Sequence, residues 1–222
     1  NPTAITRQAG YGEATAFRLL NEAMMEPYGA VWDNPLPFLT VRDNPKTHQQ
    51  SLKRIYEASH TTLQTDYLVH LPKSVSGRWG WKDPRTSLTL PYWLEVFPKS
   101  HLLYVSREAE GVVKSLMNRA NAVAEELTAP VSTLTRLSNL AKNPRKLIHA
   151  IERRLGYGSR AIPTLSMQSR EDCIRLTEIY VSECVRYRDS RYTYSEISYE
   201  AMIANPEAAV HHLIQIFGLT PS

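Results

Sequence analysis

Cysteine is scarce in this sequence, and the spacings that hold metal ions are missing. The chain of 222 residues has two cysteines, Cys173 and Cys184, and no C-x-x-C motif. Two cysteines cannot form a disulfide framework, so we expect two small apolar side chains on one helix face in a reducing compartment. The seven histidines show no paired ligand spacing, so no metal site is predicted.

Long apolar runs are absent as well. No stretch reaches the roughly eighteen apolar residues of a membrane-spanning helix, so no transmembrane segment is expected. Residues 1–7 contain neither an initiator Met nor the hydrophobic core of a signal peptide. We expect a soluble, cytoplasmic protein whose native chain has more residues before Asn1, and such residues can carry a targeting segment.

The composition that remains is that of a globular protein with a basic surplus. Hydrophobic residues make up 42% and charged residues 22% of the chain, which excludes disordered, collagenous and coiled-coil classes. The length suits one sizeable core, so we predict a single domain over residues 1–222. The net charge of +4 favours anionic ligands without naming one.

The segment from residue 78 to 121 alternates between strand-like and helix-like patterns. A short strand is predicted over residues 78–82, a helix over 86–97, a strand over 101–105 and a helix over 108–121. The run 101–105 is almost continuously apolar, which is typical of a strand buried on both faces of a parallel sheet. The alternation predicts an α/β fold. Further helices are predicted over residues 14–25, 45–63, 168–188 and 205–217, and a further strand over 194–199.

Side chains that bind anions follow the strand 101–105. Arg107 comes at its carboxyl end, the edge where ligands bind in open α/β sheets. Ser115 and Arg119 lie one turn apart on one face of the next helix. Two guanidinium groups and a hydroxyl can thus converge on one phosphate, which arginine binds bidentately. Taken alone, a surface arginine and two ordinary helix residues explain the pattern better.

Two further residues have the chemistry of a group-transfer site. Lys82 ends the predicted strand 78–82 and can place an ammonium on an oxygen that gains negative charge, and Asp83 can cap the next helix. Glu13 follows a glycine turn and can act as a general base. Taken alone, an exposed lysine and a first-turn helix acid that complements the helix dipole are the simpler explanations.

Together and in order, these segments resemble the sulfotransferases that use 3′-phosphoadenosine 5′-phosphosulfate (PAPS), in particular the bacterial branch and the tyrosylprotein sulfotransferases. The resemblance spans roughly residues 10–35, 78–121 and 194–219. The matching runs are Gly80-Trp81-Lys82-Asp83-Pro84-Arg85-Thr86-Ser87, Leu90-Pro91-Tyr92-Trp93, Phe97-Pro98, Val105-Ser106-Arg107, Val113-Lys114-Ser115-Leu116 and the segment 198–207.

The resemblance implies a P-loop-like three-layer fold, a central parallel sheet flanked by helices. It implies transfer of a sulfuryl group from PAPS to an acceptor hydroxyl or amine, release of 3′-phosphoadenosine 5′-phosphate (PAP), and no metal. The implied roles are 3′-phosphate binding for Arg107 and Ser115, further PAPS contacts for Arg119 and Tyr199, leaving-group stabilisation for the catalytic lysine Lys82, and proton abstraction for Glu13.

The sequence departs from this family at its start. The Gly- and Ser/Thr-containing loop that cradles the 5′-phosphosulfate, and the strand before it, are absent and are expected to precede Asn1. The acceptor stays open between carbohydrate, protein tyrosine, lipid and small metabolite. Residues 122–167, predicted to be a helical insertion or acceptor-site region, and the loop around Trp32 are expected to decide it.

Two other classes of protein compete with the sulfotransferases. A P-loop kinase needs the motif G-x-x-x-x-G-K-[ST], which the sequence lacks. The basic stretch 142–160 fits a non-catalytic module that binds a nucleotide, nucleic acid or acidic glycan. A solvated helical face explains this stretch more simply, so nucleic acid is not the expected partner.

Overall fold

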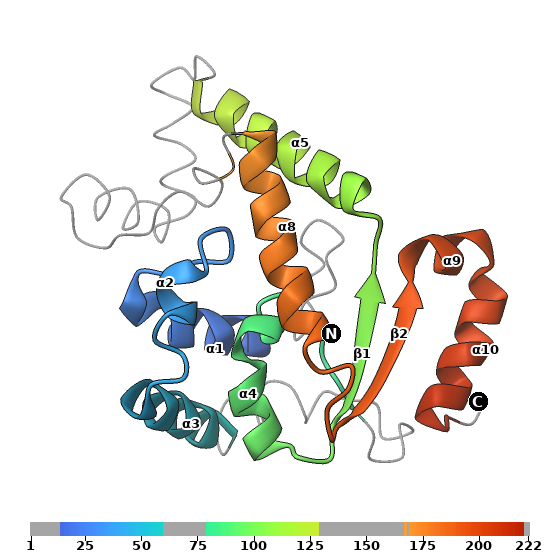
Figure 1. Cartoon of the computed structure of the whole chain (residues 1–222), viewed down its shortest axis with the longest axis horizontal. Coiled ribbons are helices and arrows are strands. Elements are labelled where there is room, and N and C mark those ends of the chain that lie inside the picture. The colour runs from blue at the N-terminus through green and yellow to red at the C-terminus, as the bar shows by residue number, and fades with distance from the viewer. Residues whose placement is uncertain (1–13, 60–78, 129–166, 168, 220–222) are drawn as a thin grey trace, which may run out of the picture.

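The computed structural model describes residues 14–59, 79–128, 167 and 169–219, the side chains of 123–128 excepted. This part is mixed α/β and mostly helical (Figure 1). None of its helices is long and apolar enough to cross a bilayer. In chain order the elements are α1 (Thr15–Met25), a 3-10 helix (Glu26–Tyr28), α2 (Leu36–Leu39), α3 (Pro45–Ser59), α4 (Thr86–Val96), β1 (His101–Ser106), α5 (Ala109–Thr128), α8 (Arg170–Val185), β2 (Thr193–Ser198), α9 (Tyr199–Ala204) and α10 (Pro206–Phe217).

The two strands form a parallel sheet. β1 and β2 pair from His101 opposite Thr193 to Ser106 opposite Ser198. Because the strands are parallel, their carboxyl ends lie at one edge, where β1 runs into α5 and β2 into α9 (Figure 1). The predictions of a strand at 101–105, a strand at 194–199 and parallel α/β character are confirmed.

Two predictions about the sheet are wrong. Residues 79–82 form no strand, because the only strands among the described residues pair with each other and leave this segment without a ladder. Trp81 instead stacks on Phe17 of α1, with ring centroids 4.2 Å apart. β1 is not buried on both faces either, since Val105 is 44% exposed in a sheet of two strands.

The larger hydrophobic core lies between α1, α3 and α4. Phe17 and Met24 of α1 recur at helical spacing and are buried, so α1 turns one stripe inward. Ile55 of α3 and Leu88 and Trp93 of α4 fill the space opposite. The predicted helices 14–25 and 86–97 are confirmed, and the helix predicted from residue 45 is seen as far as Ser59.

A second, smaller core joins α5 to α8. Val113 of α5 packs against Cys173 and Leu176 of α8. The helix α8 starts with a capping box, in which Ser169 and Asp172 bond each other's backbone N–H. Both cysteines are free, and burial raises the pKa of the Cys184 thiol to about 11, which suits the predicted apolar role.

The helix α8 also contacts the larger core, through a buried ion pair. Arg42, in the connection between α2 and α3, is 4% exposed, and its Nη1 lies 2.6 Å from Glu183 Oε2 of α8. The same Nη1 donates to the carbonyl of Leu88 in α4 at 3.2 Å. Arg42 therefore ties three elements together, and α8 bridges the two cores (Figure 1).

Candidate functional site

Arg107 and Tyr199 meet at the carboxyl edge of the sheet. Arg107 follows β1, and Tyr199 follows β2. The Arg107 Cζ lies 4.8 Å from the centroid of the Tyr199 ring, within the range of a cation–π contact. Both side chains are exposed. Two residues that the resemblance assigns to PAPS, distant in the sequence, are thus neighbours at the edge where α/β sheets bind ligands.

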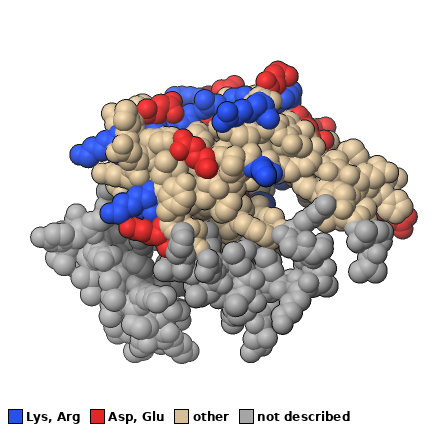
Figure 2. All heavy atoms as spheres, turned by 90° about the horizontal axis from the view of Figure 1, so that it is seen from below, with Lys and Arg blue, Asp and Glu red and all other residues tan. Residues whose placement is uncertain are grey.

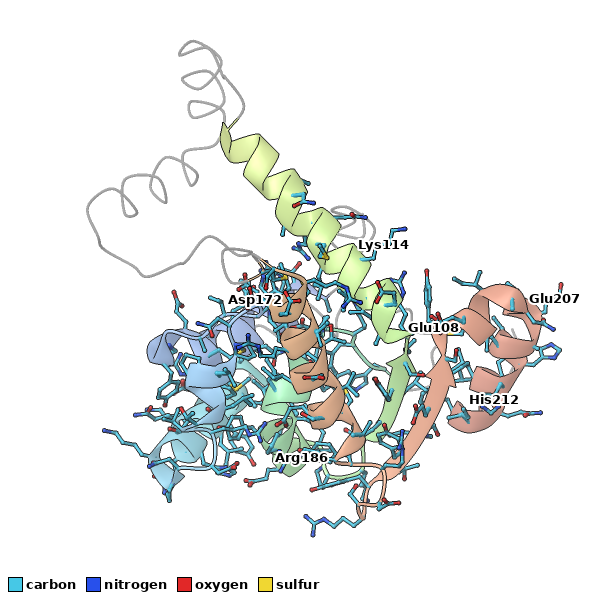
Figure 3. The ribbon with its side chains drawn as sticks, turned by 45° about the horizontal axis from the view of Figure 1, so that its top comes forward. Glu108, Lys114, Asp172, Arg186, Glu207 and His212 are labelled. Carbon is cyan, nitrogen blue, oxygen red and sulfur yellow. The ribbon has the colours of Figure 1, made fainter. Side chains whose placement is uncertain are left out.

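Glu200 fixes the surroundings of Arg107. Its Oε1 accepts from the backbone N–H of Glu108 at 3.1 Å, and its Oε2 accepts from the Ser198 hydroxyl at 2.9 Å. The Glu108 N–H contributes most to a lowered pKa of the Glu200 carboxyl, and the Arg107 charge adds to it. Figure 3 shows Glu108 where β1 runs into α5, beside the end of β2. Glu200 therefore fastens the start of α5 to β2 and α9.

The Arg107 side chain folds back along the first turns of α5. A Cβ added to Gly111 would lie 3.3 Å from Arg107 Nε, so the guanidinium stem occupies the space beside this glycine. Ser115 and Arg119 follow Gly111 at steps of four residues and so share its helix face. The helix face therefore carries Ser115 and Arg119 beyond the turn on which the Arg107 guanidinium lies.

Arg119 has a partner outside α5. Its Cζ lies 4.6 Å from the centroid of the Trp32 ring, in the loop before α2. Trp32 packs against the α5–α8 core, and its carbonyl accepts from the hydroxyl of Tyr180 at 2.7 Å. The loop around Trp32 is therefore docked on the helix that carries Ser115 and Arg119.

Lys82 belongs to a second group of contacts. Its side chain is exposed, and it lies between Trp81, stacked on Phe17, and Asp83, whose side chain is fully buried. The contacts that fix these neighbours come from α1 and α4, whereas those that fix Arg107 come from β2 and α9. The candidate residues therefore fall into two groups, which we call the strand-end group (Arg107, Ser115, Arg119, Tyr199) and the Lys82 segment (79–85).

Asp83 lies at the start of α4, as predicted, and its Oδ1 accepts from the backbone N–H of Arg85 at 3.2 Å in the turn that leads into the helix. Its side chain also points inward, because Asn21 Nδ2 donates to its Oδ2 at 2.7 Å and Arg85 Nη1 to its Oδ1 at 2.7 Å. A buried carboxylate requires such partners, and here they fix the residue that follows Lys82.

Asn21, in the middle of α1, is completely buried. Its amide nitrogen donates to Asp83 and, at 3.0 Å, to the hydroxyl of Thr86. Its carbonyl oxygen accepts from the Thr89 hydroxyl at 2.7 Å and from the Trp93 indole N–H at 2.8 Å. These four bonds use both donors and both lone pairs of the amide.

Arg85 completes this network as a charged member. Its side chain is 12% exposed and pairs with Asp83 and, at 3.3 Å, with Glu22 Oε1 of α1. Burial alone would lower the pKa of Arg85, but Asp83 and Glu22 outweigh burial and raise it.

Sequence reasoning missed Asn21, Gly111 and Glu200. The sequence could have indicated Asn21, because it is a polar residue within the apolar stripe of α1. The indication for Gly111 is weaker: glycine destabilises a helix, so its presence in one suggests a close contact. Glu200 gave no indication, because its role depends on the pairing of two distant strands.

The other predicted features have different outcomes. Glu13 and the basic stretch 142–160 lie outside the described residues. Within the ranges that the structure describes, no group of three His, Cys, Asp or Glu side chains can hold a metal ion.

On the face in Figure 2, Lys and Arg side chains gather along one edge with Asp and Glu among them. Several of the described basic residues are paired, as Arg188 is with Glu196 at 2.7 Å.

Comparisons with protein-family models, with curated proteins and with solved structures find no match to this chain. The case for a function therefore rests on the ordered motifs and on the geometry of the two groups of residues.

Proposed function

We propose that this protein is a PAPS-dependent sulfotransferase, with β1 and β2 as part of a P-loop-like three-layer fold. The observation that supports the proposal most is the meeting of Arg107 and Tyr199 at the carboxyl edge of a parallel strand pair. The sequence motifs by themselves assign both residues to PAPS. The parallel register, in which Ser106 lies opposite Ser198, brings the two residues together.

In this proposal the strand-end group binds the nucleotide. Arg107 and Ser115 hold the 3′-phosphate, because a guanidinium and a hydroxyl on one helix face can bond several of its oxygens. Tyr199 orients the Arg107 guanidinium from the side. Arg119 supplies a second positive charge further along α5, held over the Trp32 ring.

The transfer itself has the logic of phosphoryl transfer, a loose and in-line displacement. The bond between sulfur and the bridging oxygen of PAPS breaks, and a bond from sulfur to the acceptor oxygen or nitrogen forms. Glu13 takes the proton of the acceptor, and the Lys82 ammonium stabilises the charge on the departing oxygen of PAP. Lys82 is exposed, as a side chain that meets a substrate has to be.

The proposal is tested by calorimetric titration with PAP. We expect micromolar binding to the wild-type chain and none to the double variant Arg107→Ala, Ser115→Ala. The matched control is Arg175→Ala, Ser182→Ala, which removes the same residue types from the exposed surface of α8. Equal affinity of all three folded proteins, or no binding to the wild type, would contradict the proposal. Binding of PAP without any transfer from PAPS would favour the binding-module alternative.

A further inference from the structure

The buried amide of Asn21 joins α1 to the segment that carries Lys82. Asn21 donates to Asp83 at 2.7 Å, and Asp83 follows Lys82 directly in the chain. We infer that Asn21 is a positioning residue: through Asp83 it fixes the backbone from which the Lys82 ammonium reaches the substrate. The role of Lys82 in this inference rests on the proposed function, whereas the placement of the segment can be tested without it.

The segment depends on side-chain contacts. Residues 79–83 have no helix or strand ladder to hold them. Three of the contacts that hold them are the stacking of Trp81 on Phe17, the bond from Trp81 Nε1 to the Thr86 hydroxyl at 3.0 Å, and the burial of Asp83. Asn21 bonds both Asp83 and Thr86, so it links two of these three anchors.

No other residue type reproduces this set of bonds. The site needs two N–H donors for Asp83 and Thr86, and one oxygen that accepts from Thr89 and Trp93. A primary amide of this length supplies both on one plane. An aliphatic side chain would leave Asp83 short of a partner in the interior, and a carboxylate would face it with a like charge.

The first experiment measures amide hydrogen exchange in Asn21→Ala and in a matched control. The control is Tyr92→Phe, which removes a buried bond of 2.7 Å to the Arg42 carbonyl from the same core, on the helix α4 that follows the Lys82 segment. We expect exchange over residues 81–86 to rise on the order of tenfold in Asn21→Ala and to stay unchanged in Tyr92→Phe. Unchanged exchange of this segment in Asn21→Ala would overturn the inference.

The second experiment measures PAP release from PAPS, with a phenol as the probe acceptor. Lys82→Ala and Asn21→Ala are each expected to lower the rate by on the order of tenfold to a few hundredfold. The double variant should be no slower than Lys82→Ala, because Asn21 acts through Lys82. The Kd for PAP should stay unchanged, since the strand-end group is held by other elements. Additive losses, or a weakened PAP affinity, would overturn the inference.

A second variant covers the case in which Asn21→Ala does not fold. In Asn21→Asp a second carboxylate faces Asp83, so the pKa of one of the two carboxyls rises, and the proton that it gains as pH falls restores a donor between them. Around Asp83 the ionisable groups are Arg85, Glu22 on α1, Tyr180 on α8 and Asp33. We expect the ratio of variant to wild-type rate to rise as pH falls, and a constant ratio would count against the inference.

The two proposals fail in different ways. A wild-type chain that folds but releases no PAP from PAPS contradicts the proposed function, while exchange in Asn21→Ala still decides whether Asn21 holds the segment. A wild-type chain that transfers the sulfuryl group, with unchanged exchange in Asn21→Ala, contradicts the positioning role alone.

Discussion

The strand-end group and the Lys82 segment are fixed in opposite ways. Arg107 and Tyr199 are exposed, and a surface cation–π contact and the Glu200 bridge order them. The Lys82 segment has one exposed lysine beside a fully buried carboxylate, held by Asn21 and Arg85. The difference suits the proposed roles, because a nucleotide site must open and close around its ligand, whereas a group that acts on the reacting atoms must stay in place.

The largest effect on stability is expected for Asp83→Ala. This change leaves the Arg85 guanidinium largely buried without its 2.7 Å partner, so we expect the free energy of unfolding to fall by about 3–5 kcal/mol. Urea denaturation measures it. The matched control is Asp43→Ala, which removes an aspartate 3.5 Å from the buried Arg42 but 79% exposed. Its loss should stay below about 1 kcal/mol, and equal losses would contradict the contrast.

Gly111→Ala should stabilise the fold and at the same time weaken the binding of PAP to the strand-end group. Alanine favours a helix over glycine by up to about 1 kcal/mol, so thermal unfolding should shift upward. The added Cβ meets Arg107 Nε at 3.3 Å, so the exposed guanidinium has to move, and we expect the Kd for PAP to rise severalfold. Asn121→Ala, on another face of α5, should leave this Kd unchanged. An unchanged Kd in Gly111→Ala would mean that the folded-back Arg107 is not the binding conformation.

The smallest effect is expected for Glu200→Gln and depends on pH. The pKa of Glu200 is lowered from its ordinary value of 4.5, chiefly by the Glu108 N–H. A lowered pKa in the folded state means that ionised Glu200 stabilises the fold above the unfolded-state pKa, and that this contribution is lost as pH falls through the folded-state pKa. The stability difference between wild type and Glu200→Gln should therefore be constant near neutral pH and shrink below about pH 4.5. A difference that grows with acid would contradict the role of Glu200.

Much of the local structure was predictable, and the reasons are local. The apolar run 101–105 and the helical spacing of Phe17 and Met24 predicted β1 and α1, because each pattern reports the face that an element buries. The meeting of Arg107 and Tyr199 follows from the register of β1 and β2, which the sequence did not give. The Asn21 network was not predictable, because its partners lie more than sixty positions away in the chain.

The failures have a common cause. The strand expected at 78–82 and the two-sided burial of β1 both assumed more neighbouring strands than the described residues contain. Strand formation depends on a partner as much as on the residues themselves. The sequence predicted Asp83 at the start of α4, but it does not reveal that the buried amide of Asn21 also bonds this carboxylate.

The parallel register of β1 and β2 also sets the order in which the molecule can assemble during synthesis. Residues 14–97 contain α1, α3 and α4, so the contacts among these helices can form once this part of the chain has been made. β1 must wait for β2, because the register joins His101 to Thr193 across almost half of the chain. A ribosome-bound chain that ends before residue 193 contains α1, α3 and α4 but lacks Tyr199. The contact between Arg107 and Tyr199 therefore forms after the contacts among these three helices can form.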